Sequence, residues 1–262
     1  MSICLRSAKP KQAEINGRRN EIRRISEMSI SESWFGDNME YMAKFPDKFF
    51  DLAFPDPPYG IGEDGLKNHS RDKLAKAKQY TPKKWDKEIP KAEYFKELFR
   101  VSKNQIIWGG NYMLENLSNT PCFLIWDKNN SGDFADAELA WTSFNTAVRI
   151  FKYTWNGMLQ QDMKNKEIRI HPCQKPIGLY KMILPKYVNK GDKIIDTHSG
   201  SGSLRIAAWD LGFDFWSCEK DAEYFTDGNL RFETHKTKCE EIKKLGYAKT
   251  ELSKINPVFN FS

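Results

Sequence analysis

A strand, a glycine-rich turn, a helix and a second strand follow one another between residues 192 and 219, and this unit constrains the fold most strongly. It reads DKIIDTHSGSGSLRIAAWDLGFDFWSCE. Two strands joined through a helix pair in parallel, and such strands need helices to cover their faces. The unit therefore predicts an α/β fold, a largely parallel sheet with helices on both faces.

The rest of the chain continues this alternation of strands and helices. Helical patterns occur at residues 36–45, where Asp37 is placed to cap the helix, and at 91–102 and 177–188, where Pro185 is expected to bend or end the helix. Apolar runs typical of strands occur at residues 49–54, 104–110, 122–127 and 147–153.

The glycine-rich turn is the first candidate site. Gly200 and Gly202 follow a strand and precede a helix, so the backbone there can approach a ligand closely. The third glycine of the dinucleotide fingerprint is missing, which favours a smaller nucleoside ligand. Glu219 ends the next strand, where a carboxylate can accept hydrogen bonds from ribose hydroxyls. The alternative is a tight turn with a surface acid.

The second candidate site is the stiff corner FPDPPYGIG, which directly follows the apolar run FFDLAF. Pro57 and Pro58 remove two backbone donors and fix two φ angles beside the Asp56 carboxylate. The corner is thus a rigid cluster of acceptors suited to an amino group, and Tyr59 offers a flat face for the ring that carries it. The alternative is a strand terminator with a capping aspartate.

Charge and cysteine content limit the function classes. Lys and Arg number 41 against 35 Asp and Glu, a formal charge of +6, which permits a polyanionic partner. The excess gathers in residues 1–30 and 60–90, which we expect to be solvated, mobile and able to contact phosphates. Five scattered cysteines without a CxxC pair argue against a disulfide framework or a metal site. No apolar run approaches the roughly 20 residues of a membrane span, so we expect a soluble, cytoplasmic protein.

Three motifs in this order, DPPYG, HPCQKP and DTHSGSG, resemble motifs IV, X and I of the amino-methylating DNA methyltransferases that use S-adenosylmethionine. Motif IV preceding motif I resembles the β-class arrangement. The segments IIWGGNY, LIWDK and DAELAWTSF are similar to phage-type and restriction-associated DNA adenine-N6 methyltransferases. The resemblance covers roughly residues 34–235. It implies a Rossmann-like methyltransferase fold with a mixed, mostly parallel sheet, and a prokaryotic or phage origin.

The resemblance also implies roles for the corner. The target adenine would be turned out of the duplex, because its exocyclic nitrogen is paired and stacked inside. Asp56 and the Pro57 carbonyl would hold the amino hydrogens, Pro58 would stiffen the corner, and Tyr59 would stack on the base. Transfer would be a direct displacement with no covalent intermediate, helped by positioning and by acceptor electrostatics.

The cofactor S-adenosylmethionine would be held by residues from several segments. Lys175 would approach its carboxylate, Glu219 would bind its ribose, and Asp37 would either contact its adenine or only cap a helix. His198 stands where the family's usual DPF has an aromatic ring, so it departs from the pattern. The implied cofactor-binding set is Asp37, Lys175, Asp196, His198, Ser199, Gly200, Gly202, Ser203 and Glu219.

These inferences give a domain plan and a set of partners. A basic arm (residues 1–30) precedes a methyltransferase domain (31–250), which carries a mobile basic loop (62–88) and a small target-recognition region (128–170). DNA is the expected partner, a homodimer is a further expectation, and a cognate restriction nuclease is left open. The loop residues expected to contact DNA are Lys76, Lys78, Lys83, Lys84 and Trp85.

Other functions are consistent with parts of the pattern. The family also methylates the N4 amino group of cytosine, more typically with serine in place of Asp56, and DPP-type sites occur in RNA adenine methyltransferases. A catalytically silent DNA-binding protein on the same scaffold is the non-enzymatic alternative. Carbon-5 methylation of cytosine would need Cys122 or Cys173 as a nucleophile, and a nicotinamide oxidoreductase would need the missing glycine.

Overall fold

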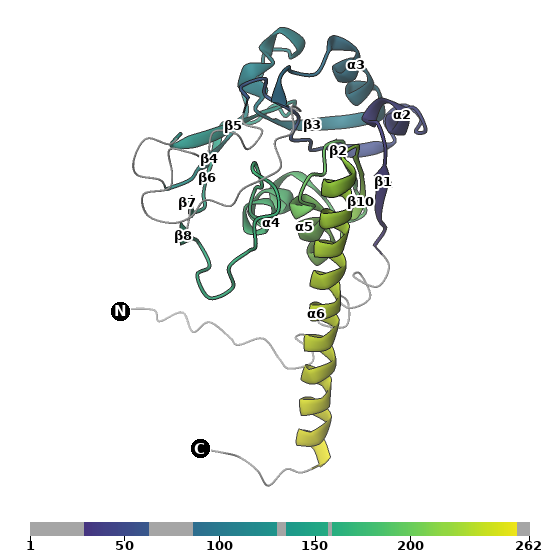
Figure 1. The fold of residues 1–262 in the computed structure, drawn as a ribbon, viewed down its shortest axis with the longest axis vertical. Helices are drawn as coiled ribbons and strands as arrows, with labels where there is room; N and C mark the ends of the chain where they lie inside the picture. The colour runs from purple at the N-terminus through teal and green to yellow at the C-terminus, as the bar shows by residue number, and fades with distance from the viewer. Residues whose placement is uncertain (1–28, 63–85, 130–134, 157–158, 256–262) are drawn as a thin grey trace, which may run out of the picture.

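The computed structural model describes residues 29–62, 86–129, 135–156 and 159–255. Eight strands form one twisted sheet in the order β1-β10-β9-β2-β3-β5-β4-β6 (Figure 1). Their bounds are β1 Ser31–Phe35, β2 Phe50–Ala53, β3 Ser102–Trp108, β4 Phe123–Asp127, β5 Ala137–Thr142, β6 Arg149–Lys152, β9 Lys193–Asp196 and β10 Asp214–Glu219. A short antiparallel ribbon joins β7 (Trp155–Asn156) to β8 (Leu159–Gln160).

Most neighbouring strands run parallel. The run from β1 through β10, β9 and β2 to β3 is parallel, and so is the pair of β4 and β6. Only β5 runs against its neighbours β3 and β4 in this sheet. The predicted mixed, mostly parallel sheet is confirmed.

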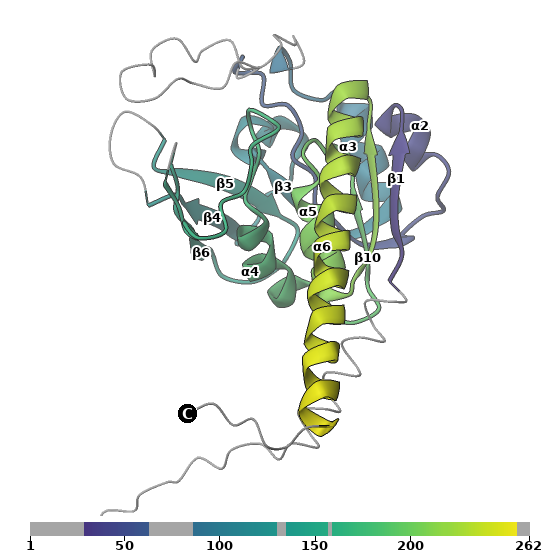
Figure 2. The ribbon, with the colours of Figure 1, turned by 60° about the horizontal axis from the view of Figure 1, so that its bottom comes forward.

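The helices lie on both faces of this sheet, as the alternation of elements predicts. On one face lie α2 (Asn38–Met42) and α3 (Ala92–Val101), and on the other lie α4 (Ile177–Tyr187) and α5 (Ser203–Leu211). A long helix, α6 (Ala222–Ile255), packs on α5, β1 and β10 and extends well beyond the sheet (Figures 1 and 2). His235 of α6 and Asp210 of α5 join the two helices at 2.8 Å.

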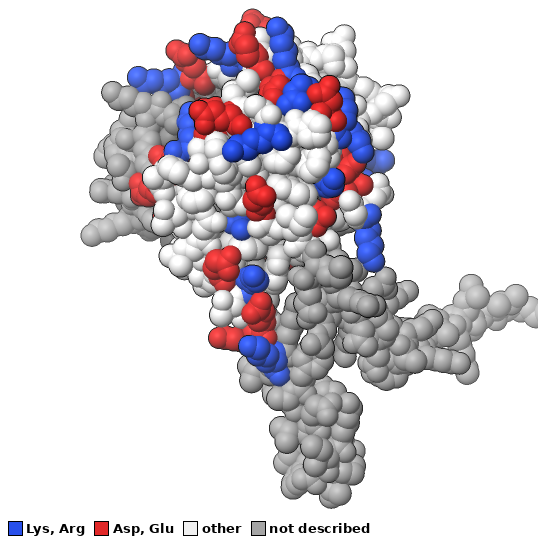
Figure 3. Space-filling model, turned by 90° about the vertical axis from the view of Figure 1, so that its right-hand side faces the viewer, with Lys and Arg blue, Asp and Glu red and all other residues white. Residues whose placement is uncertain are grey.

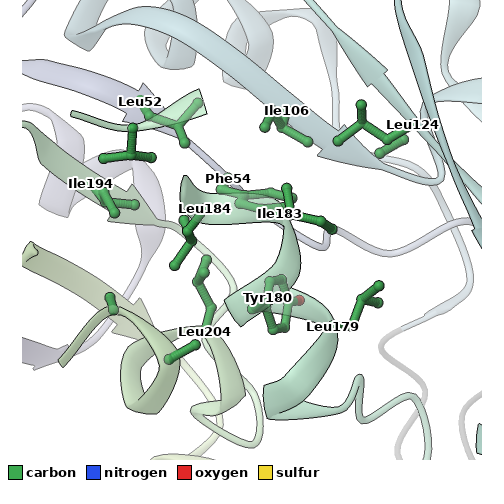
Figure 4. Close-up of a cluster of buried hydrophobic side chains, with 14 of the residues drawn as sticks. Leu52, Phe54, Ile106, Leu124, Leu179, Tyr180, Ile183, Leu184, Ile194 and Leu204 are labelled. Atoms are coloured by element: carbon green, nitrogen blue, oxygen red, sulfur yellow. The ribbon is translucent and has the colours of Figure 1, made fainter. Parts of the chain in front are cut away.

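Alternate strand residues supply two separate cores, because successive side chains of a strand point to opposite faces. In β9, Ile194 packs on the side of α4 and α5, whereas Ile195 packs on the side of α2 and α3. Ile106 and Ile107 of β3 divide in the same way. The first core gathers apolar side chains from the central strands and from α4 and α5 (Figure 4). Burial on both faces fixes the register of the central strands.

Local pattern predicted some elements and missed others. The strands and helices expected from hydrophobic periodicity all form, and Asp37 caps α2 by accepting a hydrogen bond from the Met39 N–H at 2.8 Å. Helix α4 continues past Pro185 to Tyr187, so the proline does not end it. The pattern did not identify the strands β1 and β5 or the helix α6.

Helices of the described part of the chain are all too short or too polar to cross a membrane. On the face turned to the viewer in Figure 3, basic and acidic side chains are interspersed. The two segments expected to carry the basic excess, the arm 1–30 and the loop 62–88, lie almost wholly outside the described residues.

Candidate functional site

The two motifs singled out in the sequence meet at one edge of the sheet. Strands β9 and β2 are parallel neighbours, so the glycine-rich turn after β9 and the corner after β2 leave the sheet side by side. A cavity of about 420 Å³ opens there. This volume lies within the range of small-molecule sites, and the carboxyl edge of parallel strands is where such sites occur. Its walls include Asp56, Pro57, Pro58, Tyr59, Lys175, Asp196, His198, Ser199, Gly200, Ser203 and Glu219.

Hydrogen bonds on both sides fix the corner Asp56–Tyr59. The Phe54 N–H donates to the Ile195 carbonyl at 2.9 Å, which ties the chain to β9 just before the corner. After the corner, the buried Asp86 accepts from the N–H groups of Tyr59 and Gly60 at 2.7 and 2.9 Å. The two prolines thus stand in a backbone held at both ends, and the corner is a preorganised element.

The ring of Tyr59 has closely defined surroundings. Its hydroxyl donates to Asp56 Oδ1 at 2.7 Å, and its ring stacks on Tyr112 with centroids 5.3 Å apart. A side chain at Gly109 would collide with the ring, since an added Cβ would lie 2.1 Å from Cε1 of Tyr59. Stacking of a base on Tyr59 stays a prediction.

Lys175 lies between two carboxylates, with its side chain 3% exposed. Its Nζ is 2.5 Å from Asp56 Oδ2, 3.2 Å from Glu138 Oε2 and 3.1 Å from the Tyr59 hydroxyl. Burial opposes the charge of Lys175, but the two carboxylates outweigh it and raise its pKa. The lysine expected to approach a cofactor carboxylate therefore contacts the Asp56–Tyr59 corner in this structure, and its contact with a cofactor stays a prediction.

Glu138 is the second carboxylate that contacts Lys175, and it also pairs with a second lysine. Its Oε1 pairs with Lys128 at 2.6 Å, and its Oε2 faces Lys175. Burial alone would raise the pKa of Glu138, yet the ammonium groups of Lys175 and Lys128 lower it to about 2. Burial raises the pKa of Asp56, with Lys175 acting against it. Of the two carboxylates, Glu138 is the more firmly ionised.

The glycine-rich turn adopts a conformation that few other residues tolerate. Gly200 and Gly202 have φ of 47° and 69°. The Gly200 N–H donates to Glu219 Oε2 at 2.9 Å, while the other carboxylate oxygen accepts from the Asp221 N–H at 2.9 Å. Burial raises the pKa of Glu219. A carboxylate has about four acceptor positions, so Glu219 retains capacity for ligand hydroxyls.

Helix α6 supports the turn from behind. Arg231 donates to the Ser201 carbonyl and to the Ser203 hydroxyl, both at 2.8 Å, and it pairs with Glu167 at 2.6 Å. Gly228 also lies against the turn, since an added Cβ would be 2.9 Å from the Gly200 carbonyl oxygen. Hydrophobic periodicity did not indicate this helix, although it holds the candidate cofactor loop in place.

His198, the departure from the family pattern, is neutral. Burial lowers its pKa to about 3. Its ring nitrogens lie 3.1 Å from Asn38 Nδ2 and 3.0 Å from Thr197 Oγ1. The backbone N–H of His198 donates to Asp196 Oδ1 at 3.0 Å, and burial raises the pKa of Asp196 to about 8. The hydrogen bond between the His198 ring and Asn38 thus links the turn to α2, and an aromatic hydrocarbon ring could not make it.

The remaining predicted residues fall into two groups. Asp37 caps α2, and the adjoining pocket wall includes its neighbours Gly36 and Asn38, so its contact with a cofactor stays a prediction. The proposed DNA contacts lie outside the described residues, namely Lys76, Lys78, Lys83, Lys84 and Trp85. The predicted recognition region 128–170 holds strands β5 to β8 in its described part.

Several residues of the site were not identified from the sequence. Asp86, His171, Cys173 and Tyr180 line the pocket or brace its corner, and Glu138 pairs with Lys175. The segment DAELAWTSF, which contains Glu138, was noted as a similarity but carried no chemical role. The available signal was a charged residue between apolar ones, because a charge that folds toward the interior needs a partner.

Comparison with known proteins agrees with the geometry. Residues 125–229 match the DNA methylase family of the N6/N4 type. The type II methyltransferase M2.MboI of Moraxella bovis is 26% identical over 239 residues, covering 75% of this chain and 85% of that protein. The DNA adenine methyltransferase YhdJ of Escherichia coli K12 is 25% identical over 287 residues, covering 85% and 92%.

Solved structures share the fold. The DNA modification methylase TTHA0409 of Thermus thermophilus superposes with a TM-score of 0.50 at 15% identity, covering 79% of this chain and 95% of that one. The cytosine-N4-specific PvuII DNA methyltransferase has a TM-score of 0.51 at 13% identity, covering 78% and 87%. At these identities the likeness establishes a methyltransferase fold. The family match and the sequence relatives show, in the same way, that this chain is similar to N6/N4-type DNA methylases.

Proposed function

We propose that this protein transfers a methyl group from S-adenosylmethionine to the exocyclic amino group of adenine in DNA. The observation that carries the proposal is the cavity in which the Asp56–Tyr59 corner and the Gly200–Gly202 turn face each other. One wall offers rigid acceptors for an amino group, and the other offers a nucleoside cradle. Two features favour adenine as the target base. The relative YhdJ is named a DNA adenine methyltransferase, and the corner carries Asp56 at the position where cytosine-N4 enzymes more typically carry serine.

The residues of the glycine-rich turn and Glu219 fit the cofactor S-adenosylmethionine. The positive φ of Gly200 brings backbone to the cavity wall, whereas Gly202 lies just outside the lining residues, and Glu219 lines the cavity with an acceptor position for a ribose hydroxyl. Asp196 and His198 line the same wall. When bound, S-adenosylmethionine supplies an electrophilic methyl group on a sulfonium. The protein contributes a cavity that positions two reactants and excludes water.

The corner residues act on the amino group. Asp56 accepts a hydrogen bond from the adenine amino group, and the Pro57 carbonyl accepts the second hydrogen. Both bonds direct the nitrogen lone pair toward the methyl group and favour the positive charge that develops on nitrogen. Tyr59 orients Asp56 through its hydroxyl, 2.7 Å from Oδ1.

The test is methylation of DNA by the purified protein. Genomic DNA lacking adenine methylation is incubated with S-adenosylmethionine carrying a labelled methyl group, and the nucleosides are resolved by mass spectrometry. Labelled N6-methyladenine supports the proposal, and N4-methylcytosine would move the activity to the other amino group. A parallel reaction uses RNA as the substrate. If only the RNA is labelled, the protein is an RNA methyltransferase, and if neither is labelled, it is a catalytically silent scaffold. Single-molecule sequencing of the product then gives the recognition site.

Two further parts of the proposal concern DNA and protein partners. We assign the basic loop 62–88 and the arm 1–30 to phosphate contacts, because their charge excess suits a polyanion. Region 128–170 is assigned to target recognition. A homodimer is proposed for the active form, and sedimentation velocity tests it. Sequencing the genes that flank this one would show whether a restriction nuclease is encoded beside it.

A further inference from the structure

Lys175 pairs with the carboxylate that the proposed reaction uses as the acceptor of the amino group. The Asp56 carboxylate accepts from Tyr59 at Oδ1 and from the Lys175 ammonium at Oδ2, at 2.7 and 2.5 Å. An adenine amino group would have to share this carboxylate with a resident cation. The side chain of Lys175 is 3% exposed, so water cannot readily replace its partners.

This arrangement conflicts with the charge that develops during transfer. In the transfer, the amino nitrogen would form the new N–C bond, the electron pair of the broken S–C bond would stay on sulfur as a neutral thioether, and the nitrogen would carry the positive charge until its extra proton passes to solvent. An ammonium on the same carboxylate repels that charge, and the repulsion is strong where burial limits screening. Efficient transfer therefore requires that Lys175 leave Asp56.

Glu138 offers the lysine a second position. Its Oε2 lies 3.2 Å from Lys175 Nζ, so the ammonium already contacts both carboxylates and can pair with Glu138 when it leaves Asp56. Glu138 is held in place by Lys128 at 2.6 Å. The four groups sum to zero charge, two carboxylates and two ammonium groups, and this balance is the same in both positions of the lysine.

We propose that Glu138 is a positioning residue for methyl transfer. When the amino group of the substrate enters, Lys175 leaves Asp56 and pairs with Glu138 instead. In the free protein the Lys175 ammonium pairs with the Asp56 carboxylate and offsets its charge. In the substrate complex Lys175 pairs with Glu138, and Asp56 Oδ2 accepts the amino hydrogen. This inference rests on the proposed function, because it assigns a step within that reaction.

The test is a double-mutant cycle on the rate of a single turnover at saturating cofactor. Glu138→Gln keeps the shape of the side chain but removes its charge, so Lys175 stays on Asp56 and transfer slows by about tenfold or more. Cofactor affinity, measured by calorimetry, stays within about threefold. In a Lys175→Met background no ammonium remains to be moved, so Glu138→Gln causes no further slowing.

The matched control is Glu97→Gln. Glu97 is similarly half-buried and paired with a cation, Arg100 at 2.6 Å, but it lies on α3 away from the cavity. This variant keeps the wild-type rate. If Glu138→Gln matches wild type, or slows both backgrounds by the same factor, the positioning role is wrong while the proposed function stands. If the wild-type protein transfers no methyl group to DNA, the proposed function fails and this inference fails with it.

A second measurement applies even where the variants do not fold. A crystal structure of the wild-type protein with DNA and sinefungin, a non-reactive mimic of the cofactor, locates Lys175 directly. With adenine in the pocket, Nζ within hydrogen-bond distance of Glu138 and beyond it from Asp56 supports the inference. An ammonium that still pairs with Asp56 beside a bound amino group contradicts it.

Discussion

Replacing Gly109 by alanine should displace Tyr59 and slow methyl transfer while leaving the fold intact. The new Cβ would lie 2.1 Å from Tyr59 Cε1, and ordinary carbon contacts are about 3.5 Å. The ring must therefore move by about 1.4 Å, the difference of these two distances. Such a shift would break the 2.7 Å hydrogen bond from the Tyr59 hydroxyl to Asp56.

The size of the effect follows from this displacement. Misplacing a catalytic group by about 1 Å costs on the order of 100-fold in rate, or about 2.7 kcal/mol. Gly109 also has φ of 65°, so alanine adds about 1–2 kcal/mol of backbone strain, and crowding adds about 1–3 kcal/mol. We expect the free energy of unfolding to fall by about 2–5 kcal/mol.

Gly191→Ala separates strain from displacement. Gly191 also has a positive φ, 92°, but an added Cβ there meets nothing within 4 Å. This variant should lose about 1–2 kcal/mol of stability and no activity. The assays are urea unfolding and the single-turnover rate of methyl transfer, with cofactor affinity by calorimetry. A Gly109→Ala protein that keeps more than about a third of the wild-type rate would refute the argument, as would an equal loss of rate in Gly191→Ala.

Three other substitutions test separate parts of the site. Asp56→Ala should reduce turnover more than about tenfold, because it removes the amino acceptor, while calorimetry should find most cofactor affinity retained. Glu219→Ala should weaken cofactor binding by about 1.5–3 kcal/mol, since a charge-assisted bond is lost, and unchanged affinity would remove it from the site. His198→Phe should reduce the dependence of stability on pH. The folded pKa of His198, about 3, lies below its ordinary 6.5, so as pH falls below 6.5 the unfolded chain binds a proton that the folded protein does not. At pH 5 wild type should have lost about 1–2 kcal/mol more than His198→Phe in urea unfolding, and equal losses would contradict a histidine that stays neutral in the folded protein.

The sequence by itself determined the elements whose signals are local. A carboxylate between a strand and two prolines identified the corner at Asp56, and the glycines after a strand identified the turn at Gly200. That the two sites belong to one active site was implied by the family resemblance, and the structure shows that both lie at one edge of the sheet. Asp37 could be identified as a helix cap, since capping depends on neighbours within a few residues.

Only the tertiary structure decided which charges meet. Lys175 is 119 residues from Asp56, and its position in the motif HPCQKP suggested a cofactor contact, not a pair of carboxylates. Its partner Glu138 reaches it because β5 inserts antiparallel between β3 and β4, a pairing that no local pattern indicates. Burial by itself would raise the pKa of Glu138, and that pKa is lowered only because two ammonium groups converge on the carboxylate. Solvation and charge pairing depend on the distance between atoms in space, and the order of residues along the chain does not specify that distance.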